Sequence, residues 1–405
     1  MKIKSFCGLI PGEGRTESVA SVPYDVVDIN EARQLAEGNP DSLLHVSRAE
    51  IGFPEGINPY SDQVYSRAKL NFERMIQSGA LVREPQPCMY LYRQKMGNHS
   101  QVGLVAVAHV DDYKNEVILK HEKTRPLKED DRTRIASELG AHLGPVFLTY
   151  RGREEIDAAA ATIIENALPS TRFVADDGIS HEIWRIPDGG DFSMLFESVP
   201  FSYVADGHHR SASAARVCSQ RELDNPNHTG EEDYNWFLVV MFPASQLKIL
   251  PYNRVVTDLN GHNESSFMEL VSSQFNVKLT DSGPLECPGK AKMYLSGNWH
   301  ELSWSPPVDD PVSCLDVSVL QDRLLAPILG VNDPRTDTRI DFVGGIRGNE
   351  GLESRVDSGN AAVAFSLHQV CVEQLMRVAD EGAIMPPKST WFEPKLRSGL
   401  FIHTF

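Results

Sequence analysis

The chain has 405 residues, of which 41% are hydrophobic and 23% are charged, and its formal net charge is −17. This length is enough for two or three domains with buried cores, and no apolar run approaches the roughly 20 residues of a membrane-spanning helix. The acidic balance disfavours a duplex-DNA binder, because such proteins neutralise phosphates with a basic surface.

Cysteine usage and the N-terminal residues indicate a cytoplasmic protein. The six cysteines are far apart, with no Cys-x-x-Cys pair and no Cys/His cluster at zinc spacing, so we expect reduced thiols and no structural zinc. Residues 1–11 lack the small-residue cleavage site of a signal peptide. No membrane association is predicted.

The first hundred residues predict a mixed α/β region. Residues 3–10 have the pattern of a strand, and residues 30–37 and 61–78 have the pattern of helices. Between the strand and the first helix lies Asp25, which is either a site residue on a loop or a turn-forming aspartate. We retain Asp25 as a candidate substrate contact.

A predicted hairpin and a further strand lead into the first chemically rich stretch. Residues 89–94 and 103–110 predict the hairpin, and 116–120 predict an apolar strand that runs directly into His121-Glu122-Lys123-Thr124-Arg125-Pro126. This stretch puts an imidazole, a carboxylate, a hydroxyl and two cations on consecutive residues, and it is either a site or a salt-bridged surface loop. The mixed-charge run at 128–134 predicts a solvated helix face.

Segment 201–217 carries the most specific signal. Its aromatic and β-branched beginning predicts a buried strand and its alanine-rich end predicts a helix, so Asp206-Gly207-His208-His209-Arg210 lies at a helix N-terminus. Such a terminus has unpaired N–H groups and the positive end of the helix dipole, which together hold phosphate. Arg210 can fork two hydrogen bonds onto an anion, and the helix end disfavours charged histidines. In the plainer interpretation, Asp206 is only an N-cap and the others are polar surface residues.

From about residue 258 the pattern becomes that of a separate unit, in which strands alternate with helices. Its last stretch, 385–399, contains prolines that fix a loop presenting Lys388, Ser389 and Thr390. These side chains suit phosphate or carboxylate oxygens, although a rigid loop serves domain packing equally well.

The order of these segments predicts three parts. They are an N-terminal α/β region at 1–100, a core at 101–257 that contains both chemically rich stretches, and a C-terminal α/β domain at 258–405. The expected fold class is α/β with mixed α+β character.

Motifs spread over nearly the whole chain resemble those of one bacterial family. They are Pro23-Tyr24-Asp25-Val26, His121-Glu122-Lys123-Thr124-Arg125, Asn227-His228-Thr229-Gly230-Glu231-Glu232, Arg339-Ile340-Asp341-Phe342-Val343-Gly344-Gly345 and the 385–399 stretch. The family they resemble is catalogued as domain of unknown function 1015. Its name carries no activity.

The central segment is similar to the ParB and sulfiredoxin superfamily, in which the equivalent strand-turn-helix box binds nucleotide phosphates. Within that superfamily, free L-serine kinases resemble this chain in an Asp-Gly-His-His-Arg box and an upstream catalytic glutamate. The resemblance implies a ParB/sulfiredoxin-like nucleotide-binding core with N-terminal and C-terminal α/β additions. It places the box on residues 206–210 and the glutamate on Glu122.

The resemblance and the residues agree on phosphoryl transfer to the hydroxyl of free L-serine, with Mg²⁺ and with ATP, ADP or pyrophosphate as the donor. The chain has no Walker-type P-loop to serve as the donor site. In this hypothesis the catalytic residues are Glu122 as general base, His208 and His209; the phosphate contacts are Asp206, Gly207, His208, His209, Arg210, Thr124 and Arg125; the substrate contacts are Lys388, Ser389, Thr390 and Asp25; and Asp206 is the metal ligand.

Two functions of other classes stay open. One is a ParB-like nucleotide-binding regulator without kinase activity. The negative net charge disfavours it, because such a regulator binds nucleic acid. The other is a metal-dependent hydrolase using Asp206, His208, His209 and His121. Adjacent residues of a helix project about 100 degrees apart, so His208 and His209 are poorly placed to bind the same ion. The expected partners are a nucleotide and a small serine-like molecule, with homo-oligomerisation left open.

Overall fold

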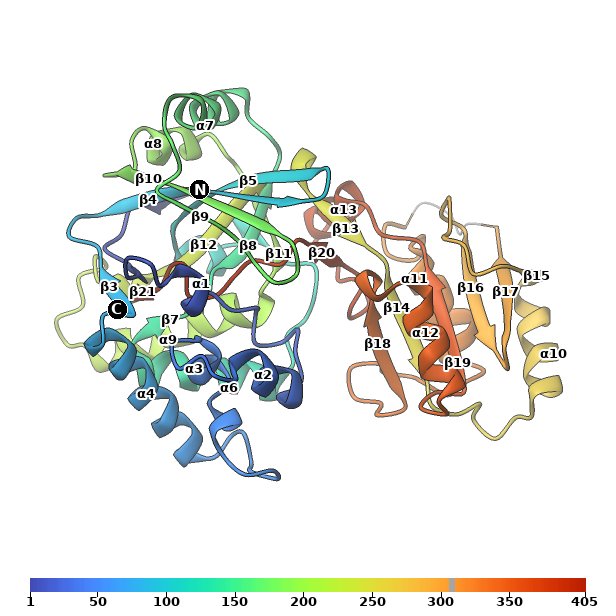
Figure 1. The fold of residues 1–405 in the computed structure, drawn as a ribbon. Coiled ribbons are helices and arrows are strands. Elements are labelled where there is room, and N and C mark those ends of the chain that lie inside the picture. The colour runs from blue at the N-terminus through green and yellow to red at the C-terminus, as the bar shows by residue number, and fades with distance from the viewer. Residues whose placement is uncertain (306–309) are drawn as a thin grey trace. The chain divides into compact units, whose positions relative to one another are not determined.

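The computed structural model describes residues 1–305 and 310–405, and these fall into two compact units (Figure 1). Unit 1 comprises Met1–Lys120, Thr124–Leu247 and Pro394–Phe405, and unit 2 comprises His121–Lys123 and Lys248–Glu393. Unit 1 is therefore built from both ends of the described chain.

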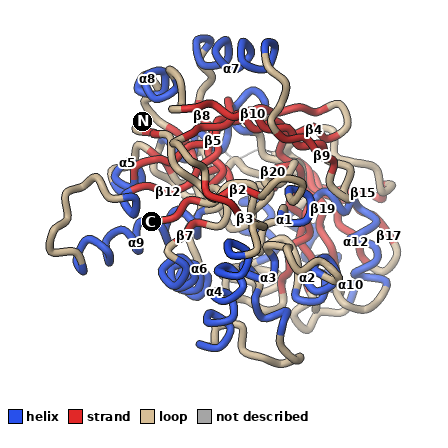
Figure 2. Tube along the Cα trace, turned by 60° about the vertical axis from the view of Figure 1, so that its left-hand side comes forward, coloured by secondary structure: helices blue, strands red, loops and turns tan. Residues whose placement is uncertain are grey.

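Unit 1 is centred on a mixed sheet, whose strands are red in Figure 2. Its strands are β1 (Ile3–Lys4), β4 (Cys88–Met96), β5 (His99–His109), β6 (Ile118–Leu119), β8 (Val146–Tyr150), β9 (Thr171–Val174), β10 (Ser180–Pro187), β11 (Ser202–Asp206) and β12 (Trp236–Pro243). The order is β6-β11-β8-β12-β5-β4-β10-β9, and β1 pairs with β5. β12 is a continuous apolar run because it lies in the interior of this sheet, parallel to β8 and antiparallel to β5.

Helices cover this sheet. The strands lie between α7 (Glu154–Asn166) and α8 (Phe192–Glu197) on one side and α4 (Asp62–Gln77) and α6 (Pro126–Leu139) on the other (Figures 1 and 2). The remaining elements of unit 1 are β2 (Leu9–Pro11), α1 (Thr16–Val19), α2 (Ile29–Ala36), α3 (Leu44–Ser47), η1 (Ala49–Gly52), β3 (Leu81–Arg83), α5 (Val110–Lys114), β7 (Ala141–His142), α9 (His208–Asp224), η2 (Asp233–Asn235), η3 (Ala244–Gln246) and β21 (His403–Thr404).

Unit 1 has two apolar clusters. The larger one joins the strands to α7, α8 and α9 and includes Leu104, Phe196 and Val239. In the smaller one, α4 contributes Phe72 and other apolar residues at near-helical spacing, which pack with Ile135 of α6. The second cluster fixes α6 and thereby positions the residues that precede it.

Unit 2 is built on an antiparallel sheet with the order β15-β17-β16-β19-β14-β18. Its strands are β14 (Tyr252–Val256), β15 (Asn276–Thr280), β16 (Lys290–Leu295), β17 (Asn298–Ser303), β18 (Ile340–Gly344) and β19 (Val363–Leu367), and β13 (Lys248–Leu250) pairs separately with β20 (Trp391–Glu393). Its helices are α10 (Glu264–Gln274), α11 (Asp316–Leu320), the π-helical turn η4 (Gln321–Leu325), η5 (Gly345–Arg347), α12 (Gly348–Asp357) and α13 (Val372–Asp380).

The predicted mixed α/β class is confirmed, as are the helix at 61–78 and the strand-turn-helix at 201–217. The solvated face predicted at 128–134 is wrong, because Asp131 is only 7% exposed and its carboxylate is buried against Tyr65 and Arg132. No described helix is long and apolar enough to cross a membrane.

The boundaries of the two compact units differ from those of the three predicted parts. Regions 1–100 and 124–247 share one unit, and 394–405 joins them because β21 pairs with β7. The three-part division stays a prediction about domains.

Candidate functional site

The turn at 206–210 joins the end of β11 to the start of α9. Gly207 has a left-handed backbone, with φ 97° and ψ 30°, and His208 opens the helix. A Cβ at position 207 would lie 3.0 Å from Arg210 Nε, so the left-handed backbone favours glycine here and an added Cβ would press on the Arg210 side chain. The first N–H groups of α9 have no carbonyl of a preceding helical turn to bind, which is the arrangement that holds anions.

The two histidines of this turn have different settings. His208 is buried, whereas His209 is half-buried and accepts at Nε2 a hydrogen bond of 3.0 Å from the backbone N–H of Arg125. An accepting Nε2 is unprotonated, so the proton of the neutral His209 ring lies on Nδ1. The same bond ties the first turn of α9 to the N-cap of α6, where Arg125 is located. A metal ion at His209 would therefore have to use Nδ1.

Arg210 supports the turn from within unit 1. Its Nη1 donates to the carbonyl of Pro145, and its side chain lines a cavity of about 50 Å³ together with Tyr24 and Arg132. Burial and the neighbouring Asp25 raise the pKa of Tyr24, while the charges of Arg132 and Arg210 lower it. Because burial dominates, the hydroxyl stays protonated at neutral pH. Asp25 itself is exposed.

Asp206 forms an ion pair with Lys395, with 3.2 Å between Oδ2 and Nζ. The two side chains are 26% and 13% exposed, so the pair is shielded from water more than an ordinary surface pair. Lys395 lies 189 residues further along the chain, and no local pattern in the sequence links the two residues.

Thr124 and Arg125 lie at the start of α6, beside α9. Thr124 Oγ1 donates to Glu129 at 2.5 Å, and Pro126 takes the first helical position, where its missing N–H is harmless. Arg125 contributes its backbone N–H to His209. The structure thus brings the backbone of Arg125, one of the two predicted phosphate contacts, next to His209 inside unit 1.

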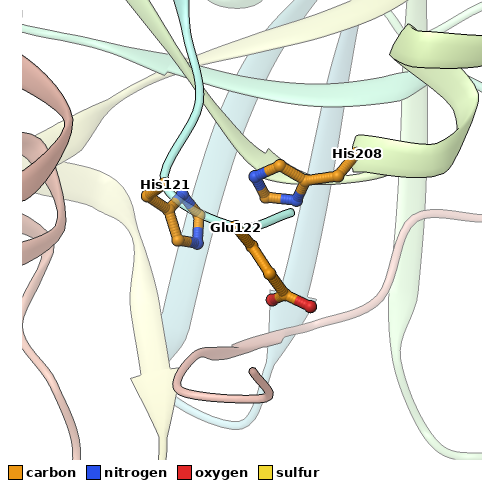
Figure 3. Close-up of side chains that lie close together, drawn as sticks. All are labelled: His121, Glu122 and His208. Atoms are coloured by element: carbon orange, nitrogen blue, oxygen red, sulfur yellow. The ribbon is translucent and has the colours of Figure 1, made fainter. Parts of the chain in front are cut away.

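His121 and Glu122 belong to unit 2, although they follow β6 directly. Figure 3 draws them with His208 and shows that they come from the loop, whereas His208 comes from the first turn of α9. His121 is 1% exposed, its Nε2 lies 3.3 Å from Thr390 Oγ1, and its carbonyl accepts from the N–H of Met385 at 2.8 Å. These bonds fix the backbone that carries Glu122.

A buried arginine of β14 interacts with Glu122. Arg254 is 2% exposed, and its guanidinium donates to the carbonyls of Tyr252 and, over 3.2 Å, of Pro387. Burial lowers the pKa of Arg254 to about 10, and the charges of Tyr252 and Glu122 oppose that shift. Arg254 therefore holds the 385–387 backbone and gives the Glu122 carboxylate a cationic neighbour within unit 2.

The predicted contacts at 388–390 interact with other residues of unit 2. Lys388 has a positive φ of 58°, and its Nζ lies 5.5 Å from the centre of the Tyr252 ring. Ser389 is 5% exposed and donates to the carbonyl of Pro386 at 2.6 Å, and Thr390 contacts His121. These residues lie in unit 2 and Asp25 lies in unit 1, so the predicted substrate contacts are divided between the two units.

The sequence profile of a family described as "Protein of unknown function (DUF1015)" matches residues 3–318. The chain belongs to this family. The match begins in β1, ends in α11 and includes both the 206–210 turn and His121–Lys123 of this DUF1015 chain. None of the curated proteins has a sequence that matches it.

Three solved structures are similar to the DUF1015 chain at low identity. A conserved hypothetical protein from Pyrococcus furiosus is 12% identical, with 73% of this chain and 93% of that chain covered and a TM-score of 0.36. A free serine kinase in complex with ADP is 11% identical, with 71% and 87% covered and a TM-score of 0.36. SbnI from Staphylococcus aureus, truncated at its C-terminus, is 12% identical, with 73% and 85% covered and a TM-score of 0.38. Similarity at this level carries no argument about activity.

Lys395 and Arg254 interact with predicted site residues but are not themselves predicted from the sequence. Arg254 stands between Tyr252 and the Val255–Val256 pair, and a charge among such residues is a signal that could have drawn attention to it, because a buried guanidinium needs a compensating partner. Lys395 offers no such signal, since its partner Asp206 is distant in sequence.

Proposed function

We propose that this DUF1015 chain is a small-molecule kinase that transfers a phosphoryl group from a nucleotide or pyrophosphate to the hydroxyl of free L-serine. The observation that carries the proposal is the 206–210 turn, in which a left-handed glycine ends a buried strand and opens a helix of 17 residues. Backbone N–H groups and the helix dipole at such a turn favour bound phosphate.

The phosphate site is assigned to the residues that surround this turn in unit 1. The backbone N–H groups of Gly207 and His208 are the central donors. A guanidinium has five N–H donors, and the bond to Pro145 uses one of those of Arg210. The link between Arg125 and His209 supports a contribution from Thr124 and Arg125, because it holds the start of α6 against the first turn of α9.

Glu122 is the proposed general base. It precedes Arg125 by three residues, and three extended residues span at most about 11 Å. Since the N–H of Arg125 binds His209, the chain itself tethers the Glu122 backbone to the neighbourhood of the turn. In the proposed step the hydroxyl proton passes to the Glu122 carboxylate, the hydroxyl oxygen forms a bond to phosphorus, and the bond from phosphorus to the donor's bridging oxygen breaks.

Asp206 is the proposed Mg²⁺ ligand. Mg²⁺ prefers oxygen donors and is commonly held by one or two carboxylates together with substrate phosphates, so a single carboxylate beside the phosphate site fits this ion. When bound, Mg²⁺ would neutralise charge on the phosphates. Lys395, which pairs with Asp206, would orient that carboxylate.

The experiment is to incubate the purified protein with L-serine, Mg²⁺ and either ATP, ADP or pyrophosphate, and to measure phosphoserine. We expect product from one of these donors. We also expect the productive nucleotide to raise the melting temperature, because a ligand that binds only the folded state stabilises it.

The absence of phosphoserine with every donor, together with an unchanged melting temperature, would remove the proposal. A raised melting temperature without phosphoserine would instead identify a nucleotide-binding regulator.

A further inference from the structure

A cavity of about 440 Å³ lies within unit 2. Of the catalytic, phosphate-binding and metal-binding residues proposed above, Glu122 is the one that lines it. Its walls come from Glu122 and Lys123, from α11 and η4, from the turn at 332–335 and from the backbone at 384–387. This volume falls in the range of small-molecule sites, about 300–1,000 Å³. Glu122 is thus a wall residue of a cavity that is large enough for an acceptor molecule.

One wall residue, Ser318, has a buried hydroxyl that makes no intramolecular hydrogen bond within the described residues. Ser318 is 4% exposed, and within the described parts of the chain its Oγ has no hydrogen-bond partner. A buried hydroxyl without a partner is unfavourable, so its presence in a cavity wall points to a polar ligand. The adjoining element, η4, is a π-helical turn, which interrupts regular helices frequently at functional sites.

The same cavity presents both signs of charge. Arg335 donates from Nε and Nη2 to the two carboxylate oxygens of Asp333, at 2.9 and 2.8 Å, and both residues line the wall. Glu122 and Asp322 add carboxylates, and Lys123 adds an ammonium group. A wall that carries both cations and carboxylates complements a zwitterion, because the carboxylate of the zwitterion needs a cation and its ammonium group needs a carboxylate.

We propose that this cavity binds the phosphoryl acceptor, a small zwitterionic amino acid that carries a hydroxyl. Lys123 and Arg335 face its carboxylate, Asp322 faces its ammonium group, Ser318 donates to it, and its hydroxyl lies toward Glu122. The chemical role of Glu122 rests on the proposed function, but binding in the cavity does not. Ser389 and Thr390 are not assigned to this site, because the Ser389 hydroxyl donates to the carbonyl of Pro386 and the Thr390 hydroxyl lies 3.3 Å from His121 Nε2.

The test is calorimetric titration of the full-length protein with L-serine as the probe, without nucleotide. Arg335→Gln is compared with Arg355→Gln, because Arg335 and Arg355 each pair with an aspartate and their side chains are 41% and 40% exposed. Arg355 does not line the cavity. Ser318→Ala is a second variant that keeps the fold, because Ser318 Oγ makes no intramolecular hydrogen bond within the described residues.

We expect Arg335→Gln and Ser318→Ala to weaken L-serine binding at least tenfold, and Arg355→Gln to bind within twofold of the unchanged protein. Loss of binding in the two cavity variants supports the inference even if no donor yields phosphoserine, in which case only the proposed function fails. Equal affinities in all variants, or no binding of L-serine by the unchanged protein, overturn the inference, and phosphoserine formation would then leave the proposed function standing.

Discussion

At the scale of single residues, the proposed phosphate site depends more on Gly207 than on any charged side chain. Its φ of 97° belongs to a region that L-residues rarely adopt, and a Cβ here would lie 3.0 Å from Arg210 Nε, so the guanidinium would have to shift. The turn therefore depends on glycine for its shape, and the phosphate site depends on the turn.

We expect Gly207→Ala to lower the free energy of unfolding by about 1–3 kcal/mol and to abolish nucleotide binding, because the strained backbone and the displaced Arg210 disturb the first turn of α9. Urea unfolding and nucleotide titration measure the two effects. Gly230→Ala is the matched control, since Gly230 has a φ of 91° but a Cβ there would meet no atom of the described residues within 4 Å. Nucleotide affinity that is equal in both variants would contradict the role of the turn.

A second single-residue prediction concerns acid stability. Burial and the neighbouring His403 lower the pKa of His142 to about 3, so His142 stays neutral in the folded protein and takes up a proton on unfolding below its ordinary pKa of about 6.5. A depressed histidine pKa makes the unfolded state bind more protons, so stability falls as pH drops from about 6.5 toward 3.

We expect the loss of unfolding free energy between pH 7 and pH 5 to be smaller in His142→Phe by about 1–2 kcal/mol. A phenyl ring keeps the packing against Phe405 and His403 and has no nitrogen to protonate. Urea unfolding at the two pH values measures the difference. The same pH dependence in both proteins would show that His142 does not contribute to it.

At the scale of elements, α6 joins the helical layer of unit 1 to the start of α9. Asp131 accepts from Tyr65 of α4 at 2.8 Å and pairs with Arg132, whose guanidinium stacks 3.8 Å from the centre of the Tyr24 ring. This cluster fixes α6, and α6 in turn positions the Arg125 N–H that binds His209.

Removing the Asp131 carboxylate would leave Arg132, whose side chain is only 11% exposed, without its carboxylate partner. Asp131→Ala is therefore expected to destabilise the protein by about 3–5 kcal/mol. Asp130→Ala is the control, because Asp130 is 59% exposed and its ion pair with Arg216 is worth about 1 kcal/mol or less. Urea unfolding distinguishes the two variants. A similar small effect of both would mean that the buried cluster does not hold α6.

The elements that the sequence predicts well are those with a strong local period. The strand-turn-helix at 201–217 and α4 follow from apolar spacing and from glycine alone. The run at 128–134 is predicted to be exposed to solvent because it is rich in charged residues. In the structure Asp131 and Arg132 pair with each other and contact two tyrosines, and little of either side chain is exposed. Charge pairing across helices has no local signature.

At the scale of the whole molecule, the chain does not follow the order of its units. It enters unit 2 for His121–Lys123, returns to unit 1 at Thr124, and after unit 2 ends in unit 1 with Pro394–Phe405. Local sequence patterns cannot predict this division of the chain, because strand pairs such as β7 with β21 join residues from distant parts of the chain. The same limit explains why Lys395 and the cavity of unit 2 could not be predicted from the sequence, whereas the segments at 206–210 and 121–125 stand out by their local composition.

In the proposed reaction Glu122 takes the proton of an acceptor hydroxyl while the 206–210 turn holds the phosphates. The most direct test is the rate of phosphoserine formation by Glu122→Gln, with Glu138→Gln on the exposed surface of α6 as the control. We expect a rate about 10²–10⁴ times lower for Glu122→Gln, unchanged nucleotide affinity and a normal rate for the control. Equal rates for Glu122→Gln and the unchanged protein would contradict the proposed role of Glu122.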